Sequence, residues 1–318
     1  MPGSGTCSFI DADDYQESLN GTPLDLVLTV AQGEFSGRAT SAKLLHLYLF
    51  RGEEDFPRIA YISLAPTLVF VGFVARGSRP MVWDGVELQP GEIVLHSPAE
   101  RFHQWTAGSC GWSLIGLAPV QLQRYSKAVV GKAVRMPPGP RILRPAARNS
   151  ARLLSRHAQA CRLAETRPKM LAHSEVARAL EQGIIQALMT CLQTTRVAGN
   201  ELARLRHRRI MIRFEEVLAE HLSRPLRIQQ LCELIGARER TLRSCCAEFL
   251  GVSPTRYVLL RRLKQAHMAL READPTTATV TEIAHACGFT ELGRFAGAYR
   301  NAFGEIPSAT LYRLARSG

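Results

Sequence analysis

Three arginines lie close together near residue 240, with a spacing that places their guanidinium groups on one surface of a helix. Arg240 and Arg243 are three residues apart, and Arg238 precedes Arg240 by two. A guanidinium group donates paired hydrogen bonds to phosphate oxygens and to the major-groove edge of guanine. Arginines on the outer face of an isolated helix are usually just solvated. Whether these side chains bind a ligand therefore depends on the elements that position them.

The segment around these arginines occurs twice, about fifty residues apart. Leu242 and Cys246 in the first copy and Phe295 and Tyr299 in the second are each four residues apart, and a glycine follows five residues later in both. Each copy predicts a short helix, a glycine turn and a second helix, which is the helix-turn-helix pattern. The second copy has one extra residue, which we expect directly after its turn.

In the first copy we expect a supporting helix over residues 228–235 and a recognition helix over residues 239–249. Gly236 falls where the chain must turn sharply, and only glycine adopts a left-handed backbone cheaply. The buried face of the second helix would comprise Leu242, Cys246 and Phe249. The outward face would offer donors for bases and phosphates: Arg238, Arg240, Arg243 and Ser244.

The composition is that of a globular protein, and its charge is unevenly distributed. The chain has 318 residues, 46% of them hydrophobic and 21% charged, which allows two domains. Of the net charge of +12, residues 1–120 contribute −6, residues 121–200 contribute +11 and residues 201–318 contribute +7. An acidic front part joined to a basic back part is typical of a sensing module attached to a polyanion-binding module.

The sequence favours a cytoplasmic protein without metal or cofactor. The eight cysteines lack metal-ligand spacing, and several occupy helix-core positions, where cysteine acts as a small hydrophobe. The acidic N-terminal segment is unlike a signal peptide, and the longest uncharged apolar stretch, about residues 62–75, is too short and too interrupted to span a membrane.

Residues 24–136 predict short β-strands between turn residues, which favours an antiparallel barrel or sandwich. The expected strands are residues 24–30, 44–50, 67–75, 92–96 and 112–117. After the breaker Pro137–Pro140, two amphipathic helices follow over residues 146–163 and 174–192, then a linker over 194–201 and a basic helix over 202–222. We therefore expect a β-rich domain (1–136), a helical segment with a linker (137–200) and a C-terminal domain (201–318).

From Leu231 to Leu311 the chain resembles the DNA-binding region of the AraC/XylS family of bacterial transcription regulators. The resemblance is carried by Arg262-Leu-Lys-Gln-Ala266, Leu270, Thr281-Glu-Ile-Ala284, Gly288-Phe289, Phe295, Tyr299, Gly304 and Pro307. It implies two helix-turn-helix units joined by a long helix, here about residues 255–273, which holds two recognition helices about one DNA turn apart. Parts of residues 289–311 are also similar to the ethanolamine-operon regulator branch.

The resemblance implies base-contacting positions in both units. In the first unit they fall on Arg240, Arg243 and Ser244, and in the second on Leu292, Gly293, Arg294, Ala296 and Gly297. Arg238 replaces the usual Ser or Thr N-cap, which forfeits about 1 kcal/mol. The second helix offers few polar side chains besides Arg294 and Arg300, so we expect the first unit to supply most of the sequence discrimination. Gly293 and Gly297 serve either close approach to DNA or tight packing on neighbouring helices.

Residues 88–103 resemble the strand-turn-strand of cupin-type sensor domains. His96 and His103 have no closely spaced histidine partner for a metal set, so a structural role for His103 is favoured. Trp83, Trp105 and His103 are candidate effector-binding residues, although a structural position in the core is favoured for any one of them. By the resemblance, the helices of residues 146–192 form a dimer interface through apolar faces that include Leu153 and Leu188; their arginines could instead approach DNA phosphates or be solvated.

The expected fold is α+β, with an N-terminal cupin-like β-barrel, a helical dimerisation segment and a C-terminal all-α double helix-turn-helix domain. The expected function is transcription regulation, as an activator and not an enzyme, through operator DNA, RNA polymerase, a small effector and a homodimer. One alternative is a metal-dependent cupin-type enzyme with a nucleic-acid-binding appendage. A third possibility is a constitutive DNA-binding protein whose N-terminal half only dimerises.

Overall fold

The computed structural model describes residues 4–20, 24–30, 35–75, 81–131, 141–193, 196–197, 201–221 and 226–313. The chain separates into two compact units, one containing residues up to 28 and 35–201, the other containing residues 29–34 and 202–318. The breaker Pro137–Pro140 and most of the expected linker over residues 194–201 lie outside the described residues.

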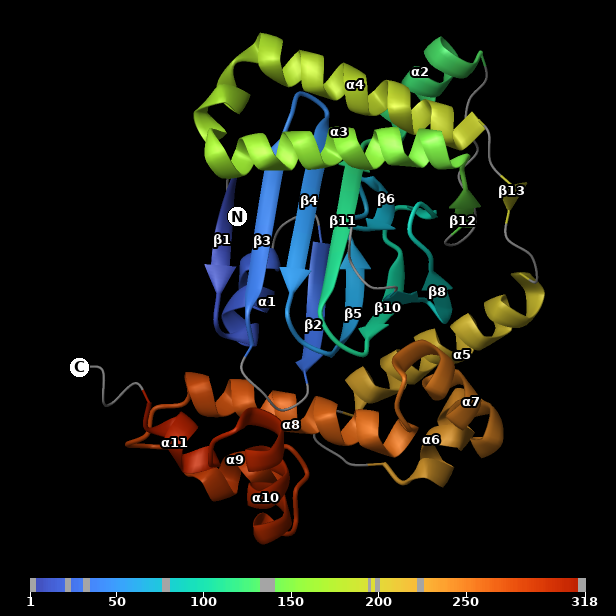
Figure 1. Cartoon of the computed structure of the whole chain (residues 1–318). Helices are drawn as coiled ribbons and strands as arrows, with labels where there is room; N and C mark the ends of the chain where they lie inside the picture. Colours follow the sequence, from blue (N-terminus) through green and yellow to red (C-terminus); the bar gives the residue numbers. More distant parts are fainter. Residues whose placement is uncertain are drawn as a thin grey trace. The chain divides into compact units, whose positions relative to one another are not determined.

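The N-terminal unit contains two antiparallel sheets (Figure 1). The larger has eight strands in the order β1 (Gly5–Phe9), β3 (Gly37–Lys43), β4 (Leu47–Glu54), β11 (Cys110–Leu117), β6 (Val69–Val74), β9 (Ile93–His96), β12 (Arg141–Arg144) and β13 (Arg196–Val197). The smaller has five, in the order β2 (Leu24–Val30), β5 (Arg58–Leu64), β10 (Arg101–Thr106), β7 (Met81–Trp83) and β8 (Val86–Leu88).

The expected closed barrel is not seen among the described residues. Closure would require the two outer strands of a sheet to pair, whereas β1 and β13 end the larger sheet and β2 and β8 end the smaller one. The predicted β-rich region also contains two helices, α1 (Ala12–Leu19) and α2 (Pro119–Val130). Asp11 caps α1 by accepting hydrogen bonds from the amides of Asp13 and Asp14, and α2 opens with a proline and ends at a left-handed glycine.

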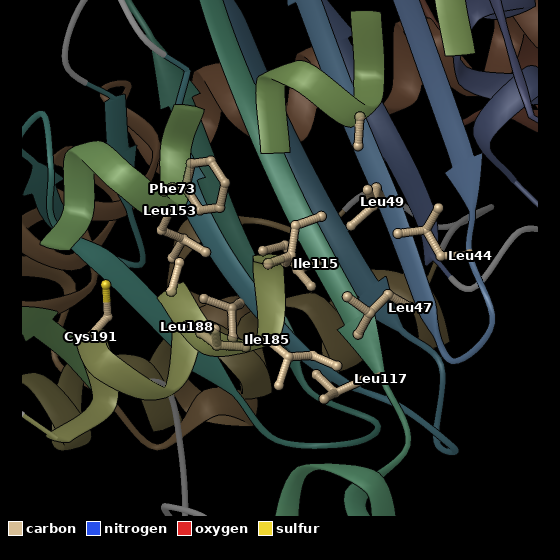
Figure 2. Close-up of a cluster of buried hydrophobic side chains, with 14 of the residues drawn as sticks. Leu44, Leu47, Leu49, Phe73, Ile115, Leu117, Leu153, Ile185, Leu188 and Cys191 are labelled. Carbon is tan, nitrogen blue, oxygen red and sulfur yellow. The ribbon is translucent and has the colours of Figure 1, made fainter. Parts of the chain in front are cut away.

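The two predicted helices after residue 146 are confirmed as α3 (Ala147–Thr166) and α4 (Ser174–Gln193), separated by a short 3₁₀ turn, η1 (Pro168–Ala172). They pack against each other, and α3 contacts β3 and β4 of the larger sheet. Leu153 and Leu188 are fully buried in one apolar cluster with Leu49 and Ile115 of that sheet (Figure 2).

This cluster shows what covers the apolar faces of α3 and α4, whereas dimerisation through this region stays a prediction. Their apolar faces are covered by the chain's own sheet, because burying them there completes the core of the N-terminal unit. These faces are therefore not available to form a dimer interface. Any contact that α3 and α4 make with another molecule uses their outward faces, which are polar. The exposed arginines of these faces lie mainly on α3, at Arg148, Arg152, Arg156 and Arg162.

The C-terminal part of the second unit, from residue 202 onward, contains helices and no strand among its described residues. Its helices are α5 (Glu201–Glu220), α6 (Ile228–Ile235), α7 (Glu239–Leu250), α8 (Pro254–Glu272), α9 (Val280–Ala286), α10 (Leu292–Phe303) and α11 (Pro307–Leu311). The predicted helices over residues 228–235, 239–249 and 255–273 are thus confirmed within one residue.

Helix α5 is part of this unit, because a buried polar network fixes it to α8. The Glu215 carboxylate accepts hydrogen bonds from the Tyr257 hydroxyl at 2.6 Å and from Arg261 Nη1 at 2.9 Å. Burial, and next the nearby Glu215 charge, raise the pKa of Tyr257 well above its usual value, so the hydroxyl keeps its proton. None of the described helices is both long and apolar enough to cross a membrane.

Candidate nucleic-acid interface

The turn of the first unit has the geometry that its sequence predicts. Gly236 ends α6 with φ +70° and ψ 33°, a left-handed conformation, and the Ala237 amide donates to the Cys232 carbonyl at 3.0 Å. Arg238 then occupies the N-cap of α7 and forms no side-chain capping hydrogen bond, as expected for an arginine there. The turn therefore fixes the start of α7 at Glu239.

The two faces of α7 are divided as predicted. Leu242, Cys246 and Phe249 are fully buried. Burial, and next the neighbouring Cys245, raise the pKa of the Cys246 thiol well above its usual value, so it packs as a neutral apolar group. The exposed face comprises Arg238, Arg240, Arg243, Ser244 and Ala247.

One feature of this face was not foreseen from the sequence. Arg243 donates from Nε at 2.8 Å and from Nη2 at 2.6 Å to Oε1 of Glu239, one turn earlier on α7. The side chains are 58% and 42% exposed, so the pair contributes only about 0.3–0.5 kcal/mol to helix stability. Its main effect is to orient the guanidinium group. The signal was present in the sequence, since an acidic residue four positions before an arginine predicts such a pair.

The second unit begins with a well-formed helix start. Thr279 Oγ1 accepts from the Glu282 amide at 3.2 Å, and Glu282 Oε2 accepts from the Thr279 amide at 2.9 Å. The left-handed turn glycine, Gly288, has φ +77°. Helix α10 starts four residues after it, whereas α7 starts three residues after Gly236. The predicted insertion after the second turn is therefore confirmed.

Helix α10 buries Phe295, Tyr299 and Ala302. Its exposed residues include Leu292, Gly293, Arg294, Gly297 and Arg300. Arg294 forms a two-point ion pair with Glu291, with Nε 3.0 Å from Oε2 and Nη1 3.1 Å from Oε1. Each recognition helix thus carries one arginine oriented by an acidic residue at its own N-terminal end.

The two glycines of α10 face open space. A Cβ atom added at Gly293 or at Gly297 would meet nothing within 4 Å. The proposal that these glycines let the helix pack tightly on its neighbours is therefore wrong, because no neighbouring atom is close enough to require them. Close approach by a molecule outside the chain is the alternative that stays open.

Helix α8 holds the second unit through two aromatic contacts. The Arg262 guanidinium lies 4.1 Å from the centre of the Phe289 ring, and its Nε donates to the Cys287 carbonyl at 2.9 Å. Nδ1 of the buried His267 is 2.6 Å from the Tyr299 hydroxyl. These contacts fix α9 and α10 against the linking helix.

The candidate effector residues of the N-terminal unit lie in different surroundings. Trp83 is 1% exposed, stacks on Phe102 at 5.4 Å, and donates from Nε1 to Nε2 of His96 at 3.0 Å. His103 is buried with its ring 4.7 Å from that of Tyr61, while Trp105 is half-buried. Trp83 and His103 therefore have packing roles, and an effector-binding role for all three stays a prediction. The described residues contain no group of three or more His, Cys, Asp or Glu side chains able to hold a metal ion.

Comparison with known proteins matches the C-terminal part of the chain. A family model described as a helix-turn-helix domain matches residues 231–313. Over 96 residues the chain is 38% identical to the probable thc operon regulatory protein of Rhodococcus erythropolis, covering 30% of this chain and 29% of that protein. Over 99 residues it is 36% identical to the XylDLEGF operon transcriptional activator of Pseudomonas putida, covering 31% of each.

Among solved structures, a probable AraC family transcriptional regulator from Rhodopseudomonas palustris CGA009 is 38% identical, covering 33% of this chain and 95% of that one, with a TM-score of 0.30. The chain spans about 30% of the length of the two curated relatives named above. The narrower similarity to ethanolamine-operon regulators stays a prediction. Through its two helix-turn-helix units, the C-terminal part of the chain, residues 231–313, belongs to the AraC/XylS family of DNA-binding domains.

Proposed function

We propose that this protein is a sequence-specific DNA-binding transcription regulator that activates transcription and is not an enzyme. The observation that supports this function best is the pair of recognition helices, α7 and α10, each with an exposed face that carries arginine. The Pseudomonas putida relative is described as a transcriptional activator, which favours activation over repression. No relative named above supports the cupin-type enzyme.

In the first unit, Arg240 and Arg243 are proposed to contact base edges, because they lie in the first two turns of α7 and point outward. Ser244 adds a hydroxyl on the same face, and Arg238 at the N-cap is placed to contact a phosphate. In the second unit, Arg294 and Arg300 are proposed to contact the backbone beside Leu292, Gly293 and Gly297. The first unit would supply most of the hydrogen-bonded discrimination.

Helix α8 is proposed to act as the spacer between the two recognition helices. With 19 residues it is about 28 Å long. That length is of the same order as one turn of DNA, ~34 Å, which separates successive major-groove segments on one face of a duplex. One chain would then contact both segments.

The N-terminal unit is proposed to sense a small molecule, to dimerise, or both. Its cupin-like motif favours the sensing role, with Trp83, Trp105 and His103 as the proposed effector-binding residues, and the proposed domain boundaries fall at residues 136 and 200. An effector that binds one arrangement of a cytoplasmic homodimer more tightly would shift the population toward it and alter contact with operator DNA and RNA polymerase.

The proposal is tested with Arg240→Ala and Arg243→Ala in the full chain. Each should weaken binding to a selected specific duplex by about 1–3 kcal/mol, roughly 5- to 150-fold, and change binding to random duplex little. Arg38→Ala is the matched control, because Arg38 is an exposed arginine on β3 in the acidic part of the chain; this variant should bind both duplexes as the parent does. Fluorescence anisotropy at fixed salt gives both affinities.

Equal losses on both duplexes would show that the arginine contacts phosphate and does not read a base. Absence of any duplex preference in the unsubstituted chain would contradict the proposed function itself.

A further inference from the structure

The two recognition helices differ at the positions that face outward. The two copies can be aligned with Leu242 opposite Phe295. In this alignment Cys246 lies opposite Tyr299 and Gly251 opposite Gly304, without a gap. In that register Arg240 corresponds to Gly293, Arg243 to Ala296 and Ser244 to Gly297. These three hydrogen-bonding side chains of α7 are thus replaced by hydrogen or methyl on α10, whereas Thr241 corresponds to Arg294.

The first residue of α10 is an exposed leucine. Leu292 is 38% exposed although it is large and apolar, and the core of this unit is completed without it by Phe295, Tyr299 and their neighbours. In the register above it corresponds to Glu239. An apolar side chain at the start of a recognition helix has one partner in the major groove, the C5-methyl group of thymine.

The space beside Leu292 is open. Apart from the adjacent residues and the backbone of α10 itself, no atom lies within 4 Å of a Cβ added at Gly293 or Gly297, so the helix backbone forms the surface there. A partner can therefore approach α10 more closely than it can approach α7, where arginines cover the helix. Arg294 and Arg300, both exposed, flank this surface with positive charge, which suits the phosphates on either side of a groove.

We infer that α10 reads thymine methyl groups in the major groove, with Leu292 as the contacting side chain and Gly293 and Gly297 permitting close approach. The inference rests on the proposed function and deepens it, since it assigns a base preference to the second unit. The first unit reads by hydrogen bonds and the second by apolar contact. The operator should accordingly contain one or more thymines about one DNA turn from the bases read by Arg240 and Arg243.

The experiment uses the full chain and DNA in which deoxyuridine replaces thymine, because this change removes only the C5-methyl group. A duplex is first selected from a random pool with the purified protein. Each thymine is then replaced singly, and affinity is measured for the parent, for Leu292→Ala and for Leu234→Ala. Leu234, on α6, is 42% exposed and provides a matched loss of apolar surface away from α10.

For the parent and for Leu234→Ala, replacement of at least one thymine in the second segment should weaken binding about 3- to 5-fold, the effect of one methyl group no longer removed from water. Leu292→Ala should bind the unmodified duplex more weakly by a similar factor and show no further loss at that thymine. The inference would be overturned if deoxyuridine weakened binding of the parent and of Leu292→Ala equally. It would also be overturned if no replacement in the segment contacted by α10 weakened binding of the parent. Either result would leave the proposed function intact. Failure to enrich any duplex would overturn the proposed function and the inference with it.

Discussion

At the scale of single residues, the exposed faces of α7 and α10 differ in chemistry, although each carries an arginine held by an acidic residue. On α7 the Arg243 guanidinium is held by Glu239, and on α10 the Arg294 guanidinium is held by Glu291. A side chain that is already oriented loses less conformational entropy on binding. The carboxylate also keeps the local charge low until a phosphate or base replaces it. Arg240 has no ion pair within the described residues, so it is free to adapt to its contact.

Replacing an exposed glycine of α10 should have opposite effects on two quantities: it should increase the stability of the fold and decrease the affinity for DNA. Gly297→Ala should raise the free energy of unfolding of the C-terminal unit by about 0.5–1 kcal/mol, because alanine favours a helix and the added methyl meets no atom. The same change should weaken specific DNA binding by about 1–3 kcal/mol, as in an overpacked contact. Urea unfolding and anisotropy measure the two effects.

Gly183→Ala on α4 is the control, because its added Cβ would make only ordinary contact with Arg156 at 3.6 Å. It should change stability without changing DNA affinity. Unchanged or tighter DNA binding by Gly297→Ala would contradict close approach at α10.

At the scale of elements, α3 is fixed on the larger sheet by a buried histidine. His157 is 1% exposed, and its ring meets that of Phe73 edge-on at 5.1 Å. Burial lowers the pKa of His157 to about 4, opposed by hydrogen bonds to the backbone of Leu114 and Phe50 and reinforced by the positive charge of Arg51. The imidazole is therefore neutral in the folded unit at pH 7.

This pKa predicts how the stability of the N-terminal unit varies with pH. An unfolded histidine has a pKa near 6.5, so between about pH 6.5 and 4 the unfolded chain binds more protons than the folded one. Stability contributed by neutral His157 is present at pH 7 and is lost as the pH falls, by about 2 kcal/mol at pH 5. Urea unfolding at both pH values measures the change.

His157→Gln removes the titrating imidazole and therefore tests whether His157 causes the pH dependence of stability. Its stability at pH 7 should be lower than that of the parent, and its further loss between pH 7 and 5 should be smaller. Parallel curves for parent and variant would assign the pH dependence to other groups. The groups facing the ring include Arg51 and Cys161, whose Sγ lies 3.8 Å from Nδ1.

At the scale of the whole molecule, charge divides the chain. Residues 1–120 are acidic, with a net charge of −6, and residues 121–318 carry the entire positive excess. Repulsion between DNA and the acidic part disfavours nonspecific contact there, whereas the basic part attracts the duplex. The sign of each part therefore supports DNA contact through residues beyond 120.

Binding should accordingly fall steeply with salt, since each phosphate contact releases counterions. For about six phosphate contacts, affinity should decrease roughly 10³-fold between about 50 and 200 mM salt. Arg238→Gln should make the slope of log affinity against log salt shallower by about one, because it removes one proposed phosphate contact. A flat response in the parent would contradict DNA binding by this surface.

The sequence by itself determined the C-terminal unit almost completely. Local signals specify its elements: Gly236 and Gly304 stop helices, Thr279 with Glu282 starts one, and the spacing of Leu242 and Cys246 defines a buried face. These signals act over one or two helical turns, which is why the boundaries, the inserted residue and the exposed arginines could be predicted. The pairing of Glu239 with Arg243 was equally local and was predictable in principle.

Only the tertiary structure decided the architecture of the N-terminal unit and the partners of its helices. Strand β1 pairs with β3, so that Gly5 lies opposite Ser41. The apolar faces of α3 and α4 are covered by β4 and β11, which lie at least thirty residues away in the sequence. A hydrophobic face in the sequence indicates that this surface is buried, but it does not indicate which element covers it. The same limit applied to Gly293 and Gly297, because whether a glycine relieves crowding depends on neighbours that only the folded chain brings near.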